Sequence, residues 1–136
     1  MPQLVKGGKW AYGWVVVGPG RELTVPPEAW REYGFRAEEV AFFTSGSRGS
    51  GGFGLSTAGL MAEVAERLGG VTPGALGRGW FGKEECVIVP PGVDVKPGDR
   101  LLAVRGSRYG LGFVARGRIY EEALGHPGLA CFEKEV

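Results

Sequence analysis

Residues 35–53 read FRAEEVAFFTSGSRGSGGF, and residues 95–113 read VKPGDRLLAVRGSRYGLGF. Laid over each other without a gap, the two stretches share Gly-Ser-Arg at 46–48 and 106–108, and Gly-Phe at 52–53 and 112–113. In both, an acidic turn leads into an apolar run that ends at the triplet. Because similarity at a constant offset is typical of an internal repeat, the sequence predicts two tandem copies of one unit. The alternative is chance similarity between glycine-rich hairpins.

The similarity extends toward the N-terminus of each copy. Residues 23–27 (LTVPP) match residues 87–91 (VIVPP), and Gly13-Trp14 matches Gly79-Trp80. Runs rich in Val, aromatic and Thr side chains, separated by glycine turns, are typical of short strands. The expected strands are 10–17, 23–25, 40–44 and about 52–55 in the first copy, and a strand from Trp80 onward, 86–89, 101–105 and 111–115 in the second.

Helical signals are confined to a few segments. Residues 27–34 begin with Pro and Glu and end at Gly, which predicts a short helix that the second copy replaces by a turn at 92–98. Ser56 is a candidate N-cap for an amphipathic connector helix over 57–70. Residues 119–124 predict a helical turn, and residues 128–133 a final strand or strap.

These segments predict one mainly β domain over residues 1–136. Its parts are pseudo-repeat one at about 9–56, the connector helix 57–70, pseudo-repeat two at about 79–117 and a C-terminal strap at 118–136. A four-strand unit with one apolar face cannot bury that face alone. We therefore expect the two copies to close into a single swapped-hairpin-like β barrel around a pseudo-twofold axis, with the connecting helix and short helical turns outside.

Composition sets broad limits on function. The 136 residues are 43% hydrophobic, enough for one core, and the net charge of +1 provides no global basic field for nucleic acid. No apolar leader or membrane span is apparent, so we expect a cytoplasmic protein without a membrane partner. Cys86 and Cys131 lie among apolar neighbours and are expected to be reduced core thiols. Asn is absent and Gln occurs once, which weakly favours a thermophilic source or a GC-rich genome.

The segment 13–35, followed by Glu38-Glu39-Val40, resembles the AbrB, MazE and SpoVT swapped-hairpin family. The match rests on Gly20-Arg21 in a loop, Val25-Pro26 at a strand end and Gly34-Phe35 after a helix. The resemblance implies a dimeric β barrel that binds DNA, as transcription regulators and antitoxins of that family do. It also implicates Arg21 in the loop and Arg31 on the helix in DNA contacts.

A second group of basic residues follows from the sequence itself. Arg100, Arg105, Arg108, Arg116 and Arg118 occur without an intervening acidic residue. On a hairpin turning near 107–110 they are expected to form one strip, and the guanidinium fork is suited to phosphate. The alternative is a solvated hairpin surface whose arginines protect an edge strand. The predicted DNA-binding set is therefore Arg21, Arg31, Arg105, Arg108, Arg116 and Arg118.

The second hypothesis is a non-enzymatic barrel that binds a phosphorylated small molecule or a protein partner. Its candidate residues are the paired triplets Gly46, Ser47, Arg48 and Gly106, Ser107, Arg108, whose backbone N–H groups are suited to an anion nest. The alternative is that the glycines serve only as turns. The substitution Arg21→Ala should abolish DNA binding and leave binding at the triplets intact.

Catalysis and metal binding have little support in the sequence. His126 is the only histidine and precedes a proline in a turn, no nucleophile has an evident base partner, and metal-ligand spacing is missing. We expect neither an enzyme nor a cofactor. The expected partner is double-stranded DNA, and the alternative to a self-contained chain is pairing with a second copy through Tyr12, Trp14 or the strand that holds Phe42-Phe43.

Overall fold

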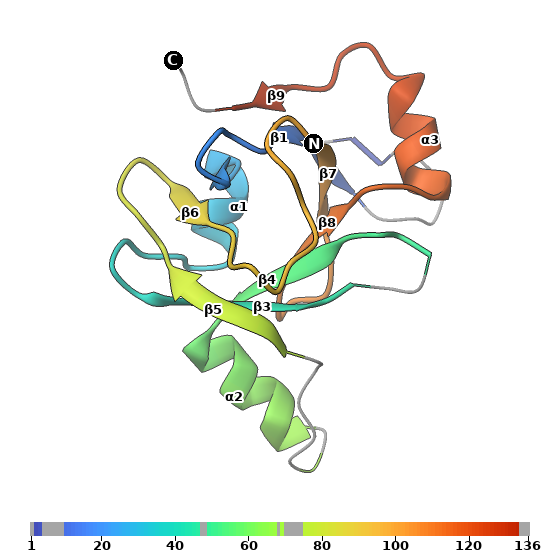
Figure 1. Cartoon of the computed structure of the whole chain (residues 1–136). Coiled ribbons are helices and arrows are strands. Elements are labelled where there is room, and N and C mark those ends of the chain that lie inside the picture. The colour runs from blue at the N-terminus through green and yellow to red at the C-terminus, as the bar shows by residue number, and fades with distance from the viewer. Residues whose placement is uncertain (1, 4–9, 47–48, 68, 70–74, 134–136) are drawn as a thin grey trace.

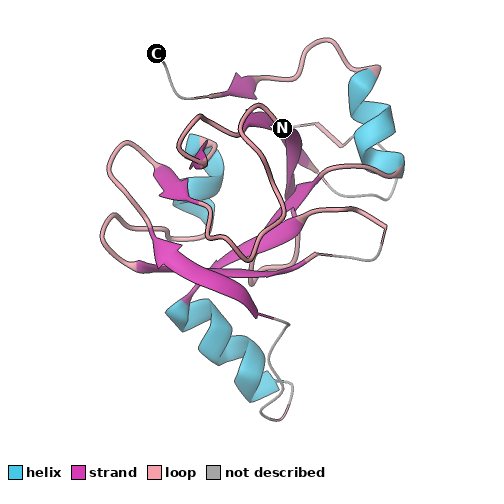
Figure 2. Cartoon of the chain, in the orientation of Figure 1, coloured by secondary structure: helices cyan, strands magenta, loops and turns pink. Residues whose placement is uncertain are grey.

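The computed structural model describes residues 2–3, 10–46, 49–67, 69 and 75–133. Strands dominate, as predicted, and three helices are found in these ranges (Figures 1 and 2). The strands are β1 (Ala11–Val16), β2 (Glu22–Thr24), β3 (Val40–Ser45), β4 (Phe53–Thr57), β5 (Ala75–Trp80), β6 (Cys86–Ile88), β7 (Arg100–Arg105), β8 (Leu111–Val114) and β9 (Cys131–Phe132). The helices are α1 (Pro27–Glu32), α2 (Ala58–Arg67) and α3 (Arg118–Leu124).

Most strand pairs join the first half of the chain, β1 to β4, to the second half, β5 to β8. The large sheet has the order β5-β3-β4-β8-β7-β1-β9, and β2 pairs with β6 in a separate ribbon. Strand β1 lies against β7, β3 against β5, and β4 against β8, all antiparallel. Only the hairpins β3–β4 and β7–β8 lie within one half.

Backbone hydrogen bonds near the ribbon are reciprocal between the halves. The Val25 N–H donates to the Glu85 carbonyl at 2.8 Å, and the Val89 N–H donates to the Arg21 carbonyl at 2.9 Å. Within the ribbon, Leu23 lies directly opposite Val87. Each half therefore offers the same donor and acceptor positions to the other.

The structural correspondence between the first strands of the two halves, β1 and β5, differs by two positions from the one that the sequence alignment gave. Gly13 and Gly77 both lie at a register shift and have φ angles of 148° and 147°. Such positive angles are readily available to glycine. The structure therefore aligns Gly13 with Gly77, not with Gly79, and β5 ends at Trp80 where the sequence predicted a strand to begin.

The predicted closed barrel is not found. The sheet is open, with β5 at one edge and the short parallel strand β9 at the other. Strands β2 and β6 pair with each other in the separate ribbon, and one isolated antiparallel bridge joins Val87 of β6 to Phe81, directly after β5.

The helices cover different parts of the sheet (Figure 1). Helix α1 begins at Pro27 and ends with a left-handed Gly34, where the Phe35 N–H donates to the Trp30 carbonyl as in a Schellman motif. Helix α2 is capped by Thr57, whose Oγ1 accepts from the Leu60 N–H at 3.1 Å, and not by Ser56 as predicted. Helix α3 packs beside β1 and β7.

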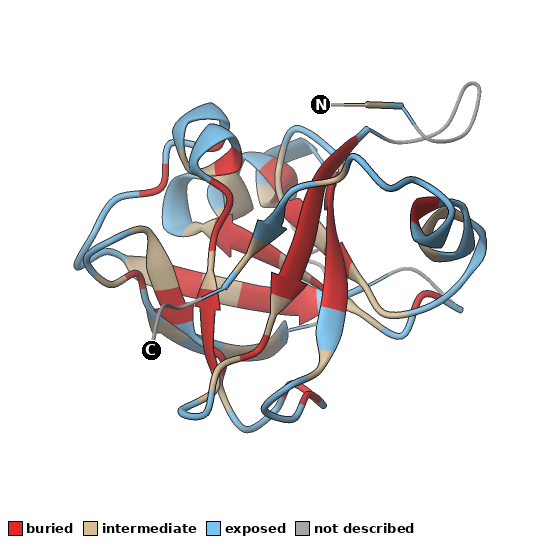
Figure 3. Cartoon of the chain, turned by 90° about the horizontal axis from the view of Figure 1, so that it is seen from above, coloured by how far each residue is buried: buried red, intermediate tan, exposed pale blue. Residues whose placement is uncertain are grey.

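Two apolar clusters hold these layers together. Figure 3 shows the buried segments of the chain in red. The larger one lies inside the curved sheet and includes the fully buried Phe43, Phe53, Phe81 and Phe113. The smaller one lies between α3 and the outer face of β1 and β7, around Trp14. Strand β1 is buried on both faces because the two clusters meet there.

The cysteines depart from the sequence prediction, and most of the aromatic residues expected to join two copies are buried. Both thiols are free, but Cys86 is half-buried and Cys131 is exposed, so neither is a core thiol. Tyr12, Trp14 and Phe43 are buried within the chain, whereas Phe42 is half-buried. Of the residues expected to join two copies, three are therefore covered by this chain's own elements.

Candidate functional site

Arg21 occupies the loop between β1 and β2 in a left-handed conformation, with a φ of 64°. Its guanidinium donates to four carbonyls of the second half: Nε to Val89 O at 3.3 Å, Nη2 to Pro90 O at 2.8 Å and to Val93 O at 2.9 Å, and Nη1 to Val95 O. A guanidinium carries five N–H groups, so one is left. The structure gives Arg21 the role of holding the 89–95 segment, and little of its donor capacity remains for DNA.

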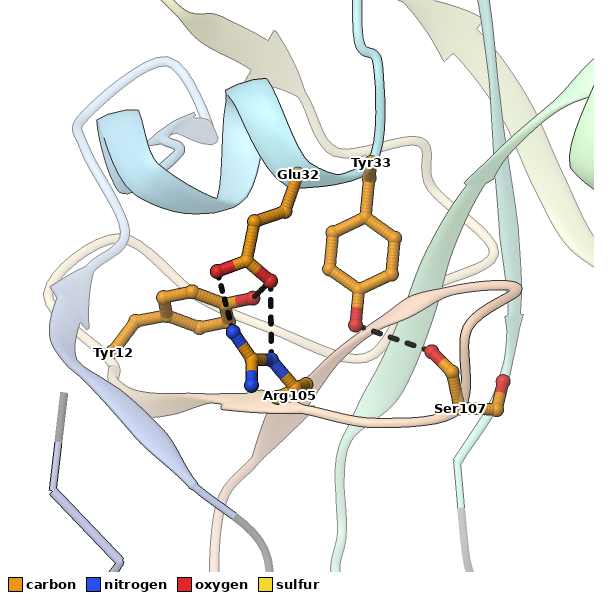
Figure 4. Close-up of polar contacts among 5 residues, drawn as sticks. All are labelled: Tyr12, Glu32, Tyr33, Arg105 and Ser107. Atoms are coloured by element: carbon orange, nitrogen blue, oxygen red, sulfur yellow. Dashed lines mark hydrogen bonds and ion pairs between the residues drawn. The ribbon is translucent and has the colours of Figure 1, made fainter.

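A second polar cluster links α1 to the end of β7 (Figure 4). Glu32 accepts two hydrogen bonds from Arg105, from Nη2 at 2.6 Å and from Nε at 3.0 Å. The buried Tyr12 hydroxyl donates to the same carboxylate at 2.9 Å. This bidentate pair, with side chains 42% and 31% exposed, fixes the helix to the sheet.

The cluster perturbs the titration of its members. Hydrogen bonding from Arg105 holds the pKa of Glu32 below its usual value. The same pair raises the pKa of the Arg105 guanidinium. Burial raises the pKa values of Tyr12 and Tyr33. All four groups therefore keep their ordinary charge states near neutral pH, so the cluster is a structural ion pair and not an acid–base pair.

Beside this cluster the turn between β7 and β8 forms a small hollow. The Tyr33 hydroxyl donates to the Ser107 carbonyl at 3.2 Å and closes one wall. The hollow has a volume of about 280 Å³ and is lined by Glu32, Tyr33, Arg105, Gly106, Ser107 and Arg108. Arg108 is the most available cation there, because its contact to Glu63 is long, at 3.6 Å, and its side chain is 66% exposed.

The arginines of the second hairpin do not form the single strip that the sequence predicted. Arg105 lies opposite Leu111, near the turn, together with Arg108. Arg100 begins β7, and Arg116 and Arg118 follow the end of β8. These three residues therefore lie at the end of the hairpin that is remote from the β7–β8 turn.

The second group of arginines is also partly engaged. Arg100 lies over the Trp14 ring, 4.0 Å from its centroid, and Arg116 Nε donates to the Gly49 carbonyl at 3.2 Å. Among the described residues, Arg31 on α1 and Arg118 at the start of α3 are exposed and have no side-chain hydrogen bond or ion pair. Two separate groups of arginines thus replace the expected strip.

The structure describes only part of the paired Gly-Ser-Arg triplets. Ser47 and Arg48 lie outside the described residues. Gly46 and Ser107, one from each triplet, line a common hollow of about 270 Å³. Its lining includes Thr44, Gly54 and Gly112 but no charged side chain among the described residues, so the described lining of the hollow is neutral.

Sequence reasoning missed Glu32, Tyr12 and Tyr33 as members of the α1–β7 cluster. Glu32 and Arg105 lie 73 residues apart, and no local pattern signals their contact. The repeat predicted that the two copies pack together, but it carried no information about which side chains of α1 would face β7.

The described residues contain no group of three His, Cys, Asp or Glu side chains placed to hold a metal ion. None of their helices has the length and apolar character required to cross a membrane.

Comparison of the chain with known proteins adds no relative. No protein-family model matches the sequence, and a search of curated proteins finds no match. The likeness to the AbrB, MazE and SpoVT family therefore rests on the residues of the segment 13–40.

Proposed function

We propose that this protein is a DNA-binding regulator of the swapped-hairpin type, in which one chain supplies both halves that two chains supply elsewhere. The reciprocal exchange of strands between the halves is the observation that carries the proposal. Besides the ribbon bonds, the Gly98 N–H donates to Val17 O and the Glu38 N–H to Phe81 O, both at 2.7 Å, at corresponding positions. A tandem duplication followed by divergence accounts for this correspondence.

The arginines assigned to DNA in this proposal differ from those that the resemblance implied. Arg21 is excluded as a principal contact because four of its N–H groups bind carbonyls of the chain. Arg108 and Arg31 remain, near the β7–β8 turn and on the exposed side of α1, with Arg105 turned toward Glu32. They would contact phosphates, which gives affinity without base specificity.

The test is titration of the purified protein with labelled duplex DNA at about 50 mM and about 200 mM salt, because phosphate contacts release counterions. The Arg108→Ala variant should bind several-fold more weakly and lower the salt slope by about one. Arg67→Ala, which removes the same charge from the end of α2, is the matched control and should bind as the parent does. Absence of binding at the lower salt would reject the proposal.

A phosphorylated small molecule is the second candidate, and the hollow shared by Gly46 and Ser107 is the observation that favours it. Gly112 and Val104 both line this hollow, and a Cβ at Gly112 would lie 3.0 Å from Val104 Cγ2. Calorimetric titration with nucleoside phosphates should therefore detect binding to the parent protein that Gly112→Ala weakens. Equal binding by both proteins would reject this candidate.

A further inference from the structure

The four tryptophans of the chain fall into two kinds. Trp14 packs edge-on against Tyr120, and Trp30 packs against two phenylalanine rings. Trp10 and Trp80 are 42% and 63% exposed, and within the described part of the chain neither has a ring partner or belongs to an apolar cluster. These two rings are therefore open to contact with another molecule.

The backbone of Trp10 is held between two neighbours. Its carbonyl accepts from the Arg105 N–H at 2.7 Å, and on its other side it forms an antiparallel bridge with Gln3. The adjacent pairing of Ala11 with Val104 places Trp10 directly opposite Arg105. Because side chains of directly opposed residues leave a sheet on the same face, the side chains of Trp10 and Arg105 lie side by side.

The face that carries Trp10 and Arg105 is turned toward α1. Arg105 binds Glu32 of that helix through two hydrogen bonds, and the Tyr12 hydroxyl donates to the same carboxylate (Figure 4). Glu32 therefore offsets the charge of Arg105 and fixes the position of its guanidinium. The unpaired positive charge of this face comes from other arginines.

Two exposed arginines supply that charge. Arg31 precedes Glu32 on α1, and Arg108 lies in the β7–β8 turn with its side chain 66% exposed. Arg105 and Arg108 line the same hollow of about 280 Å³. Proteins that bind single-stranded nucleic acid combine such cations, which contact phosphates, with an aromatic ring on which a base stacks.

The surroundings of Trp80 lack this excess of positive charge. The two hollows beside its ring are lined by Arg36 and Arg78, but also by Glu38 and Glu39. The charges of these four side chains balance, so phosphate gains little there. Of the two exposed tryptophans, Trp10 is therefore the one placed to meet a nucleic acid.

We propose that Trp10 stacks on an unpaired base of bound DNA while Arg31 and Arg108 contact neighbouring phosphates. The inference rests on the proposed function, because it uses the arginines that are assigned to DNA there. Stacking requires no hydrogen bond to the base edge, so the contact tolerates any base. A paired base is already stacked within the duplex, and the site therefore favours DNA whose strands are locally separated.

The experiment compares two labelled duplexes of equal length at about 50 mM salt, one fully paired and one with a short central bubble of mismatched bases. The parent protein should bind the bubble at least about fivefold more tightly, which is the effect of one stacked base. Trp10→Ala should abolish this preference and leave binding to the paired duplex unchanged, whereas Trp10→Phe keeps a ring and should retain most of the preference. Trp80→Ala, which removes a more exposed indole from β5, is the matched control and should bind as the parent does.

Tryptophan fluorescence gives a second readout that does not depend on the alanine variant. The bubble should quench part of the emission of the parent protein, and Trp10→Phe should remove that quenching.

The outcomes separate this inference from the proposed function. Equal affinity of the parent for both duplexes, a preference that Trp10→Ala retains, or equal weakening of both duplexes by Trp10→Ala would overturn the stacking contact and leave DNA binding standing. Binding of the bubble alone would reject recognition of paired DNA and support the stacking contact. Absence of binding to either duplex would reject the proposed function and the inference with it.

Discussion

Arg21 shows how one side chain can replace part of a missing element. The second half has no helix in its 92–98 segment, and the guanidinium of Arg21 instead binds carbonyls of residues 90–95. Its own backbone carbonyl accepts from Val89. Both the side chain and the main chain of this residue therefore bind the other half.

The Arg21→Lys substitution keeps the charge but removes the planar fork that reaches several carbonyls at once. We expect a loss of about 2 kcal/mol in the free energy of unfolding, because donors bound to buried carbonyls are lost together. Urea denaturation measures it, with Arg31→Lys as the control at an exposed position without a partner. An equal midpoint for Arg21→Lys and the parent protein would disprove the structural role.

At the scale of elements, the link between α1 and β7 depends on the ionised Glu32. Its pKa in the folded protein is lowered below the ordinary value of 4.5, chiefly by the hydrogen bond from Arg105. A group with a lowered folded pKa adds stability that is present above the unfolded pKa and is lost as pH falls through the folded one.

We therefore expect Glu32→Gln to be less stable than the parent by about 0.5–1 kcal/mol at pH 7, a modest value because the pair is partly exposed. The difference should shrink as pH falls below about 4.5. Thermal unfolding across a pH series measures this. Glu66→Gln on α2, whose side chain makes no ion pair with a described residue, should show no such trend. A constant deficit for Glu32→Gln would contradict the electrostatic explanation.

The position of most elements could be predicted because the signals are local. Pro27 and Gly34 delimit α1, and short apolar runs bounded by glycine turns predict β3, β4, β7 and β8. The error at β5 arose because Gly79-Trp80 copies Gly13-Trp14 in letters, while the bulge is at Gly77. A register shift depends on the partner strand, which the local sequence does not show.

The candidate site was predictable only in part. The sequence identified Arg105, Ser107 and Arg108 near one turn, and they line one hollow. It did not indicate that Arg21 would be bound to carbonyls or that Glu32 would pair with Arg105, because both contacts join residues about 70 positions apart. The spacing of arginines along the sequence does not show which carboxylates or carbonyls they contact in the folded protein.

For the whole molecule, the pairing scheme makes each half depend on the other. Strand pairs β1–β7, β3–β5, β2–β6 and β4–β8 all cross between them. An isolated half would expose the faces and edges that these pairs bury. A two-stranded hairpin alone is marginal in water.

Two fragments, cut between Arg67 and Ala75, test this dependence. Each alone should lack a cooperative thermal transition, and mixing them should restore a 1:1 complex with the circular dichroism spectrum of the intact chain. Light scattering of the mixture measures the stoichiometry. A fragment that unfolds cooperatively as a monomer would show that the halves are independent.

Because the chain is synthesised from its N-terminus, β1 leaves the ribosome before the strand that covers it. Its residues are almost all buried in the finished fold, and its main partner β7 begins at Arg100. At roughly 5–20 residues per second, about 5–20 s pass before that partner emerges. During this interval the nascent chain carries an apolar, uncharged stretch with high strand propensity, which is the kind of segment that aggregates. The yield of native protein is therefore expected to depend on translation speed and on chaperones that cover the first strand.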